Sequence, residues 1–237
     1  MLNGIAWAEP GRPDGAPEHN RIVKDRLCAL VTQAHGLGDL LASRILDQSV
    51  EQELRSYDGL LQSYADEQDI MPMRFGTCVA TLDDVQDLLG RHEVTSTNWL
   101  RSFAGRREFA VRVQRETDPS LQVEPHADGG RNYLARQLAS RKAVEQSREQ
   151  TQQFLFRTQM TLESYGVLQK LAKVPSAEHR IAGWACLISR VRIEALCQAV
   201  ETLNSDAQAL GLSVTVSGPH APFAFAALEI GCKDPIQ

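Results

Sequence analysis

Apolar residues recur along this chain with the helical period in some stretches and with the strand period in others. Ser49 and Gln52 have the spacing of a capping box. An apolar face then recurs at three- and four-residue steps through Val50, Leu54, Tyr57, Leu61 and Tyr64. This spacing predicts a helix that begins near Ser49.

Two shorter helices follow in the same half of the chain. Thr81 with Asp84 predicts the capped start of a helix that ends at Gly90. The next helix carries Trp99, Leu100 and Phe103 and stops before a glycine, Gly105.

Alternating or continuous apolar runs predict four strands around these helices: Gly4–Ala8, Leu27–Val31, residues 70–80 and Phe109–Val113. Pro72 has no backbone N–H, so we expect it at the start of its strand or at a sheet edge. The order β, β, α, β, α, α, β indicates an α+β domain, compatible with a ferredoxin-like split βαβ arrangement.

The second half begins after a break in composition over residues 117–131, which hold two prolines and two glycines. Residues 132–174 predict a long helix broken near Gly166, with a thin apolar stripe that its own domain covers only partly. A run apolar on both faces, Ile181–Ile188, predicts a central strand. A helix over Ile193–Leu210 follows, and then two strands, one with Val214 and Val216 and one with Phe223 and Phe225.

These elements predict two small modules. We expect an N-terminal α+β domain over residues 1–116, a linker over residues 117–131, and a long helix with a second α+β module over residues 132–237.

Charge and hydropathy exclude several classes of partner. The chain of 237 residues has a formal net charge of −5, which argues against nucleic acid, because phosphate contacts need a basic face. No window approaches the roughly 18 apolar residues of a membrane span. The first residues lack the basic region of a signal peptide. We therefore expect a cytoplasmic protein with no membrane partner.

The side chains that carry chemistry are scattered. The five cysteines are odd in number and have no C-x-x-C spacing, so we expect them to be reduced and buried as small hydrophobic residues. The six histidines have no metal-ligand spacing, and no serine has a G-x-S-x-G context. The sequence predicts no catalytic residue, no metal and no cofactor. Two basic pairs, Arg106-Arg107 and Arg141-Lys142, are interpreted as solvated faces.

The stretch Asp69–Ala80 places a proline, an arginine and an aromatic residue inside an apolar run. Met73 and Phe75 are predicted core residues, and Gly76 is predicted to permit a close backbone approach or a bulge. Arg74 has two interpretations: a structural residue that reaches solvent or a carboxylate, or part of an exposed binding edge.

Four motifs in register resemble the gas vesicle protein F/L family (GvpF/GvpL). The first is Pro-Met-Arg-Phe-Gly-Thr at Pro72–Thr77, and the second is Gly105–Glu108 before an alternating strand. Tyr133-Leu134 resembles the family's long-helix start, and Ser217–Phe225 resembles its Gly-Pro-x-x-Pro-aromatic turn. His220 and Ala221 stand where the family turn usually has Trp and Pro, and Phe223 stands for its Tyr.

The resemblance implies a protein that is not an enzyme and that serves gas vesicle assembly as an accessory or minor structural component. Its implied partners are the small hydrophobic shell subunit, whose aggregation it would prevent, and other gas vesicle accessory proteins. The candidate partner-binding or signature residues are Pro72, Met73, Arg74, Phe75, Gly76, Gly218, Pro219, Pro222 and Phe223. The alternatives are a ligand-sensing regulatory module on ferredoxin-like domains and an enzyme whose site assembles in space. A deep pocket lined by convergent polar groups would favour either alternative.

Overall fold

The computed structural model describes residues 1–9, 12–33, 48–116, 130–171 and 179–226. The chain divides into two compact units: unit 1 comprises Met1–Glu108 with Pro219–Gln237, and unit 2 comprises Phe109–Gly218. The chain leaves unit 1 within one strand, β5 (Arg106–Arg115), and returns within another, β8 (Leu212–His220). Unit 2 is therefore an insertion in the sequence of unit 1.

This division differs from the predicted domains, because the return segment Pro219–Gln237 belongs to unit 1. Residues 117–129, most of the predicted linker, lie outside the described residues. That residues 117–131 act as a linker stays a prediction.

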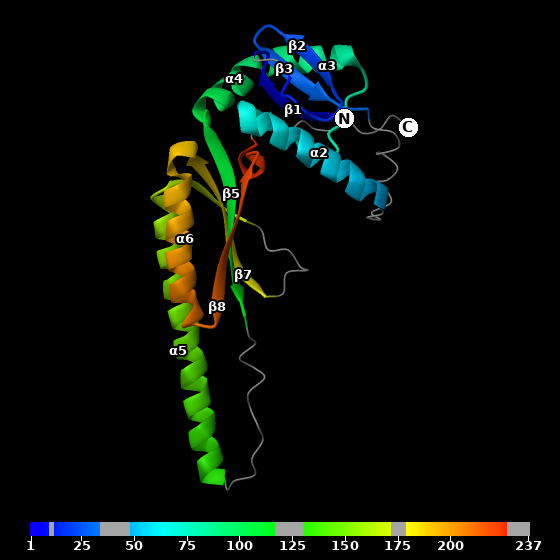
Figure 1. Ribbon diagram of the computed structural model, residues 1–237. Helices are drawn as coiled ribbons and strands as arrows, with labels where there is room; N and C mark the ends of the chain where they lie inside the picture. The colour runs from blue at the N-terminus through cyan, green and yellow to red at the C-terminus, as the bar shows by residue number, and fades with distance from the viewer. Residues whose placement is uncertain (10–11, 34–47, 117–129, 172–178, 227–237) are drawn as a thin grey trace. The chain divides into compact units, whose positions relative to one another are not determined.

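Unit 1 contains a four-stranded antiparallel sheet in the order β2-β3-β1-β4. Its strands are β1 (Leu2–Trp7), β2 (Asn20–Lys24), β3 (Leu27–Val31) and β4 (Ile70–Pro72). Figure 1 shows α2 (Gln48–Glu67) on one side of this sheet and α3 (Leu82–Arg91) on the other. A further helix, α4 (Glu93–Ser102), packs on the α3 side through Trp99 and Leu100.

Because helices cover both faces, all five residues of β3 are buried, which explains its continuous apolar run. One face packs with Tyr57, Leu60, Leu61 and Tyr64 of α2, and the other packs with Val85, Leu88 and Leu89 of α3. The capping box predicted at Thr81 and Asp84 is confirmed, whereas Gly90 lies inside α3 rather than ending it. Leu54, predicted on the buried face of α2, is exposed, whereas Leu60, which the predicted face did not include, is buried.

Unit 2 has the element order of a ferredoxin-like split βαβ arrangement. After β5 come α5 (Gly130–Glu163), β6 (Gly166–Lys170), β7 (Arg180–Ser189), a 3₁₀ turn η2 (Arg190–Arg192), α6 (Ile193–Gln208) and β8. The sheet order is β6-β7-β5-β8, and β6 pairs antiparallel with β7. Figure 1 shows α5 and α6 on the same side of this sheet. Its core joins Phe109, Val111 and Val113 of β5 to Trp184, Cys186, Phe154, Leu196 and Val200.

The predicted α+β class is confirmed, and the split βαβ order predicted for the first module is complete in unit 2. Unit 1 has the same relative strand order, but the described residues between its β1 and β2 form turns and no helix. Both units thus use one sheet order with different connections.

Three predicted elements differ from the structure. The strand predicted over residues 70–80 ends at Pro72, because Arg74–Thr77 closes a turn. The long helix ends at Glu163, and the residues after the predicted break at Gly166 form strand β6. The strand predicted at Phe223 and Phe225 is a 3₁₀ turn, η3, because β8 continues through Gly218 and Pro219.

The partial cover predicted for the long helix is confirmed. Residues 137–150 of α5 are all exposed, whereas Thr151, Phe154, Thr158 and Leu162 form a buried stripe near its end. Over the part of the chain that the structure describes, no helix has both the length and the apolar character that crossing a membrane requires.

The cysteine prediction holds only in part. Cys28 and Cys186 are buried and Cys197 is half-buried, but Cys78 is exposed, since it lies beyond the end of β4. These four are free thiols, and Cys232 lies outside the described residues.

Candidate functional site

The Pro72–Thr77 turn is built around the start of β1 in unit 1. The Met73 N–H donates to the Asn3 carbonyl at 2.8 Å, and the Leu2 N–H donates to the Thr77 carbonyl at 2.8 Å. The Thr77 hydroxyl donates to the Arg74 carbonyl at 2.7 Å, which closes the turn. Gly76 has a φ of 83°, a conformation in which a side chain would be strained. The motif therefore encodes a tight turn at the sheet edge.

Tyr57 of α2 joins this turn to the segment that returns after β8. Its hydroxyl donates to the Met73 carbonyl. Its ring lies 5.3 Å from the Phe75 ring and 5.9 Å from the Phe223 ring, centroid to centroid. Burial raises the pKa of Tyr57, so the hydroxyl stays a neutral donor. Two of the predicted motifs, far apart in sequence, meet on this one side chain.

The returning segment, Pro219–Ala226, is also held through its backbone. The carboxylate of Glu108 accepts a hydrogen bond from the Ala224 N–H at 2.8 Å. The indole N–H of Trp99 donates to the Phe225 carbonyl at 2.8 Å. The Phe103 ring lies 4.8 Å from the Trp99 ring and 6.3 Å from the Phe225 ring. These contacts form an aromatic groove, defined by Tyr57, Trp99, Phe103 and Glu108, that contains the segment.

The structure brings Met73, Phe75 and Phe223 together around Tyr57, but it turns several of the predicted site residues inward. Pro72, Met73 and Pro222 are buried, whereas Phe75, Gly76 and Phe223 are half-buried and Arg74, Gly218 and Pro219 are exposed. Pro72 lies in β4, an edge strand, as its missing N–H predicts. The signature residues thus connect the two ends of unit 1.

Sequence reasoning missed the other half of the groove. Trp99 and Phe103 were predicted only as helix residues, although their four-residue spacing places both on one face. Glu108 belongs to the Gly105–Glu108 motif, which by itself assigns no role to this residue. No local pattern pairs these residues with a segment more than 110 positions later, as the hydrogen bond from Ala224 to Glu108 does at a separation of 116.

Among the described carboxyl groups, Glu108 has a pKa that departs clearly from its ordinary value. Burial raises its pKa from 4.5 to about 7, and the hydrogen bond from the Ala224 N–H opposes this increase. Folding therefore keeps a proton on Glu108 at pH values where the unfolded chain has lost it.

The pH dependence of stability should report this proton. Between about pH 4.5 and about pH 7 the unfolded chain binds fewer protons than the folded chain, so the free energy of unfolding should fall as pH rises. The full shift corresponds to roughly 3 kcal/mol. Urea unfolding at about pH 5.5 and about pH 8 should show about 2 kcal/mol of this loss in the natural chain and a much smaller one in Glu108→Gln. An equal loss in both proteins would contradict the assignment to Glu108.

Arg107 corrects the interpretation of Arg106-Arg107 as a solvated pair. Its side chain is only 4% exposed, with a guanidinium nitrogen 3.8 Å from a carboxylate oxygen of Asp69. It donates to the carbonyls of Arg106 and Gln68. The same Asp69 oxygen accepts from the Gly105 N–H at 2.9 Å. This network fixes the entry of β5.

A second polar cluster lies within unit 1. His19 places Nε2 2.8 Å from the Tyr64 hydroxyl and Nδ1 2.7 Å from the Pro17 carbonyl. Burial lowers the pKa of His19, so the neutral ring donates from Nδ1 and accepts at Nε2. This arrangement satisfies a buried tyrosine, and its role is structural. In the described ranges no group of three or more His, Cys, Asp or Glu side chains is placed to hold a metal ion.

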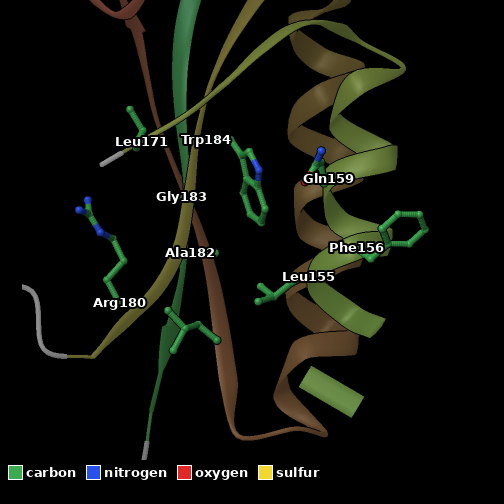
Figure 2. A pocket seen from close by; sticks show the side chains of 9 residues that line it. Leu155, Phe156, Gln159, Leu171, Arg180, Ala182, Gly183 and Trp184 are labelled. Atoms are coloured by element: carbon green, nitrogen blue, oxygen red, sulfur yellow. The ribbon is translucent and has the colours of Figure 1, made fainter. Parts of the chain in front are cut away.

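A cavity of about 350 Å³ lies in unit 2 between α5, β7 and Leu171 (Figure 2). Two of its lining residues, Gln159 and Arg180, carry polar side chains, and the others are apolar or glycine. Figure 2 shows Phe156 pointing away from the sheet. The lining is that of an apolar groove rather than the set of convergent polar groups expected of a catalytic or ligand-sensing pocket.

The comparisons with known proteins agree with this fold. The family model for "Gas vesicle synthesis protein GvpL/GvpF" matches residues 10–227. The structure is similar to the crystal structure of the gas vesicle protein GvpF from Anabaena sp. PCC7120, with a TM-score of 0.69 and 19% identity, covering 96% of this chain and 95% of that chain. It is also similar to GvpF from Microcystis aeruginosa, with a TM-score of 0.66 and 15% identity, covering 96% and 98% of the two chains. No curated protein matches.

The family match spans both units, including the Pro72–Thr77 turn and the whole segment Pro219–Ala226. The described contacts join the Pro72–Thr77 turn, Glu108 and the segment Pro219–Ala226 into one arrangement. This chain belongs to the gas vesicle synthesis protein GvpL/GvpF family.

Proposed function

We propose that this chain acts in gas vesicle assembly as an accessory or minor structural protein that binds the hydrophobic shell subunit and prevents its aggregation. The observation that carries the proposal is the family match over residues 10–227. A small subunit with a large apolar surface aggregates unless another protein covers that surface before it joins a wall. The work would take place in the cytoplasm, on the growing vesicle, beside other gas vesicle proteins.

We place one contact of the shell subunit at the turn that follows β4. Arg74 is exposed there, next to the half-buried ring of Phe75, and Gly218 and Pro219 are also exposed. An arginine beside an aromatic residue is a combination that protein interfaces favour. The edge position of β4 leaves one side of this strand without a neighbour in the described sheet.

Replacing Arg74 with alanine tests this contact. Because the side chain is exposed, its loss should change the free energy of unfolding by about 1 kcal/mol or less. Loss of an interface arginine should weaken binding of the shell subunit roughly fivefold or more. Binding is measured by co-purification of the shell subunit with each variant, and stability is measured by thermal unfolding.

The matched control is Arg101→Ala, which removes another exposed arginine of unit 1, at the end of α4. Binding should be retained in this control. If Arg74→Ala and the natural chain bind the shell subunit equally, the turn is not part of the interface. If neither protein binds the shell subunit, the proposed function itself is contradicted.

A further inference from the structure

The aromatic groove of unit 1 recognises the returning segment mainly through features that many peptides share. Its two polar groups bind backbone atoms: Glu108 binds the Ala224 N–H, and Trp99 binds the Phe225 carbonyl. Only the two rings of the segment give it sequence character, with Phe223 beside Tyr57 and Phe225 beside Phe103. A backbone clamp with two positions for side chains is how peptide-binding grooves combine affinity with selectivity.

The segment itself has little structure that would hold it in place without the groove. Phe223–Phe225 is a single 3₁₀ turn, and a turn of this length has few bonds of its own. Phe223, Ala224 and Phe225 are each half-buried rather than buried. Gly218, with a φ of 142°, precedes the segment and Pro219 begins it, and both lie in β8.

The groove contains a buried titratable side chain. Glu108 is 6% exposed, and burial raises the pKa of its carboxyl to about 7. Fewer contacts hold this segment than hold the fully buried strand β3, so opening of the segment should require less free energy than unfolding of the sheet.

We propose that the groove of Tyr57, Trp99, Phe103 and Glu108 is a binding site for a short aromatic-x-aromatic peptide segment. Residues 219–226 are its resident intramolecular ligand, and a partner protein with a segment of the same chemistry binds by displacing them. This site adjoins the turn that carries Arg74, because Tyr57 contacts Phe75, but its test does not depend on the identity of the shell subunit.

The first test uses a labelled peptide with the sequence of residues 218–226, Gly-Pro-His-Ala-Pro-Phe-Ala-Phe-Ala. The full chain carrying Phe223→Ala and Phe225→Ala keeps the groove but weakens its resident segment. Fluorescence anisotropy should show the peptide binding this variant about tenfold or more tightly than the natural chain, in which the segment competes. A peptide with alanine at both phenylalanine positions should bind neither protein.

Trp99→Phe added to the double variant keeps an aromatic ring but removes the N–H that binds the Phe225 carbonyl. Peptide affinity should fall by roughly fivefold or more. No binding of the natural peptide to a double variant whose circular dichroism and melting match the natural chain would overturn the proposal. Binding of the alanine peptide with equal affinity would overturn it as well, since the rings would then not be recognised.

A second measurement needs no substitution and decides the matter if the double variant does not fold. Hydrogen exchange of the natural chain should show the Ala224 amide exchanging at least about a hundredfold faster than core amides of the sheet such as Ala29. Exchange of Ala224 only together with Ala29 would mean that the segment opens only on global unfolding, and it would overturn the proposal. Neither result depends on the shell subunit, so the proposed function stands or falls separately.

Discussion

Replacing Arg107 with alanine is expected to lower the free energy of unfolding of the chain by about 3 kcal/mol. The guanidinium is 4% exposed and binds two backbone carbonyls as well as approaching Asp69. Its removal leaves the Gln68 carbonyl without this donor and a cavity at the entry of β5. The expected value lies at the low end for a broken buried ion pair because Asp69 is 22% exposed and retains the Gly105 N–H.

Arg106→Ala is the matched control, since it removes the neighbouring arginine, whose side chain is half-buried. This substitution should cost less than about 1 kcal/mol. Urea unfolding of both variants, followed by circular dichroism, measures the difference. Equal costs for the two substitutions would show that the contacts of Arg107 contribute little to stability.

Gly166→Ala is expected to be the most damaging single change in unit 2, with a cost of about 3 kcal/mol or more. Gly166 faces Ile188 in the β6–β7 pair. An added Cβ would lie inside contact distance of the Leu187 carbonyl oxygen, which belongs to the backbone and cannot rotate away. The strand β6 must therefore move from β7, and its ladder of hydrogen bonds is strained.

The same substitution at Gly183 provides the control within the same sheet. A Cβ at Gly183 would meet Leu171 at 3.5 Å, an ordinary van der Waals contact. Gly183→Ala should change the melting temperature by only a few degrees, since it costs less than about 1 kcal/mol. If Gly166→Ala and Gly183→Ala have the same melting temperature, the close approach of the two strands is not what requires glycine at position 166.

The sequence predicted best the elements that local patterns determine. The capping box at Thr81 and the continuous apolar run of β3 each identify an element through neighbouring residues alone. The break at Gly166 was visible as well, but the strand that follows was not. A five-residue strand at a sheet edge has too few positions for its period to stand out from a helical pattern.

The contacts between the groove and its segment could not be predicted because they join residues separated by more than 100 positions. Phe223 and Phe225 alternate as strand residues do, yet they form a 3₁₀ turn because tertiary contacts to Tyr57 and Trp99 determine their backbone. Arg107 looked solvated beside Arg106 because nothing local shows that Asp69 approaches it. The motifs marked the right residues, and the structure shows that most of them pack against one another.

The insertion of unit 2 has a consequence for vectorial synthesis on the ribosome. The 110 residues of Phe109–Gly218 are made after the first part of unit 1 and before the segment that completes it. At about 5–20 residues per second this interval lasts roughly 5–20 s. During that time Tyr57, Trp99 and Phe103 have no returning segment to cover them. A nascent chain of this protein therefore passes through a stage with an open aromatic groove, when another polypeptide has its easiest access to it.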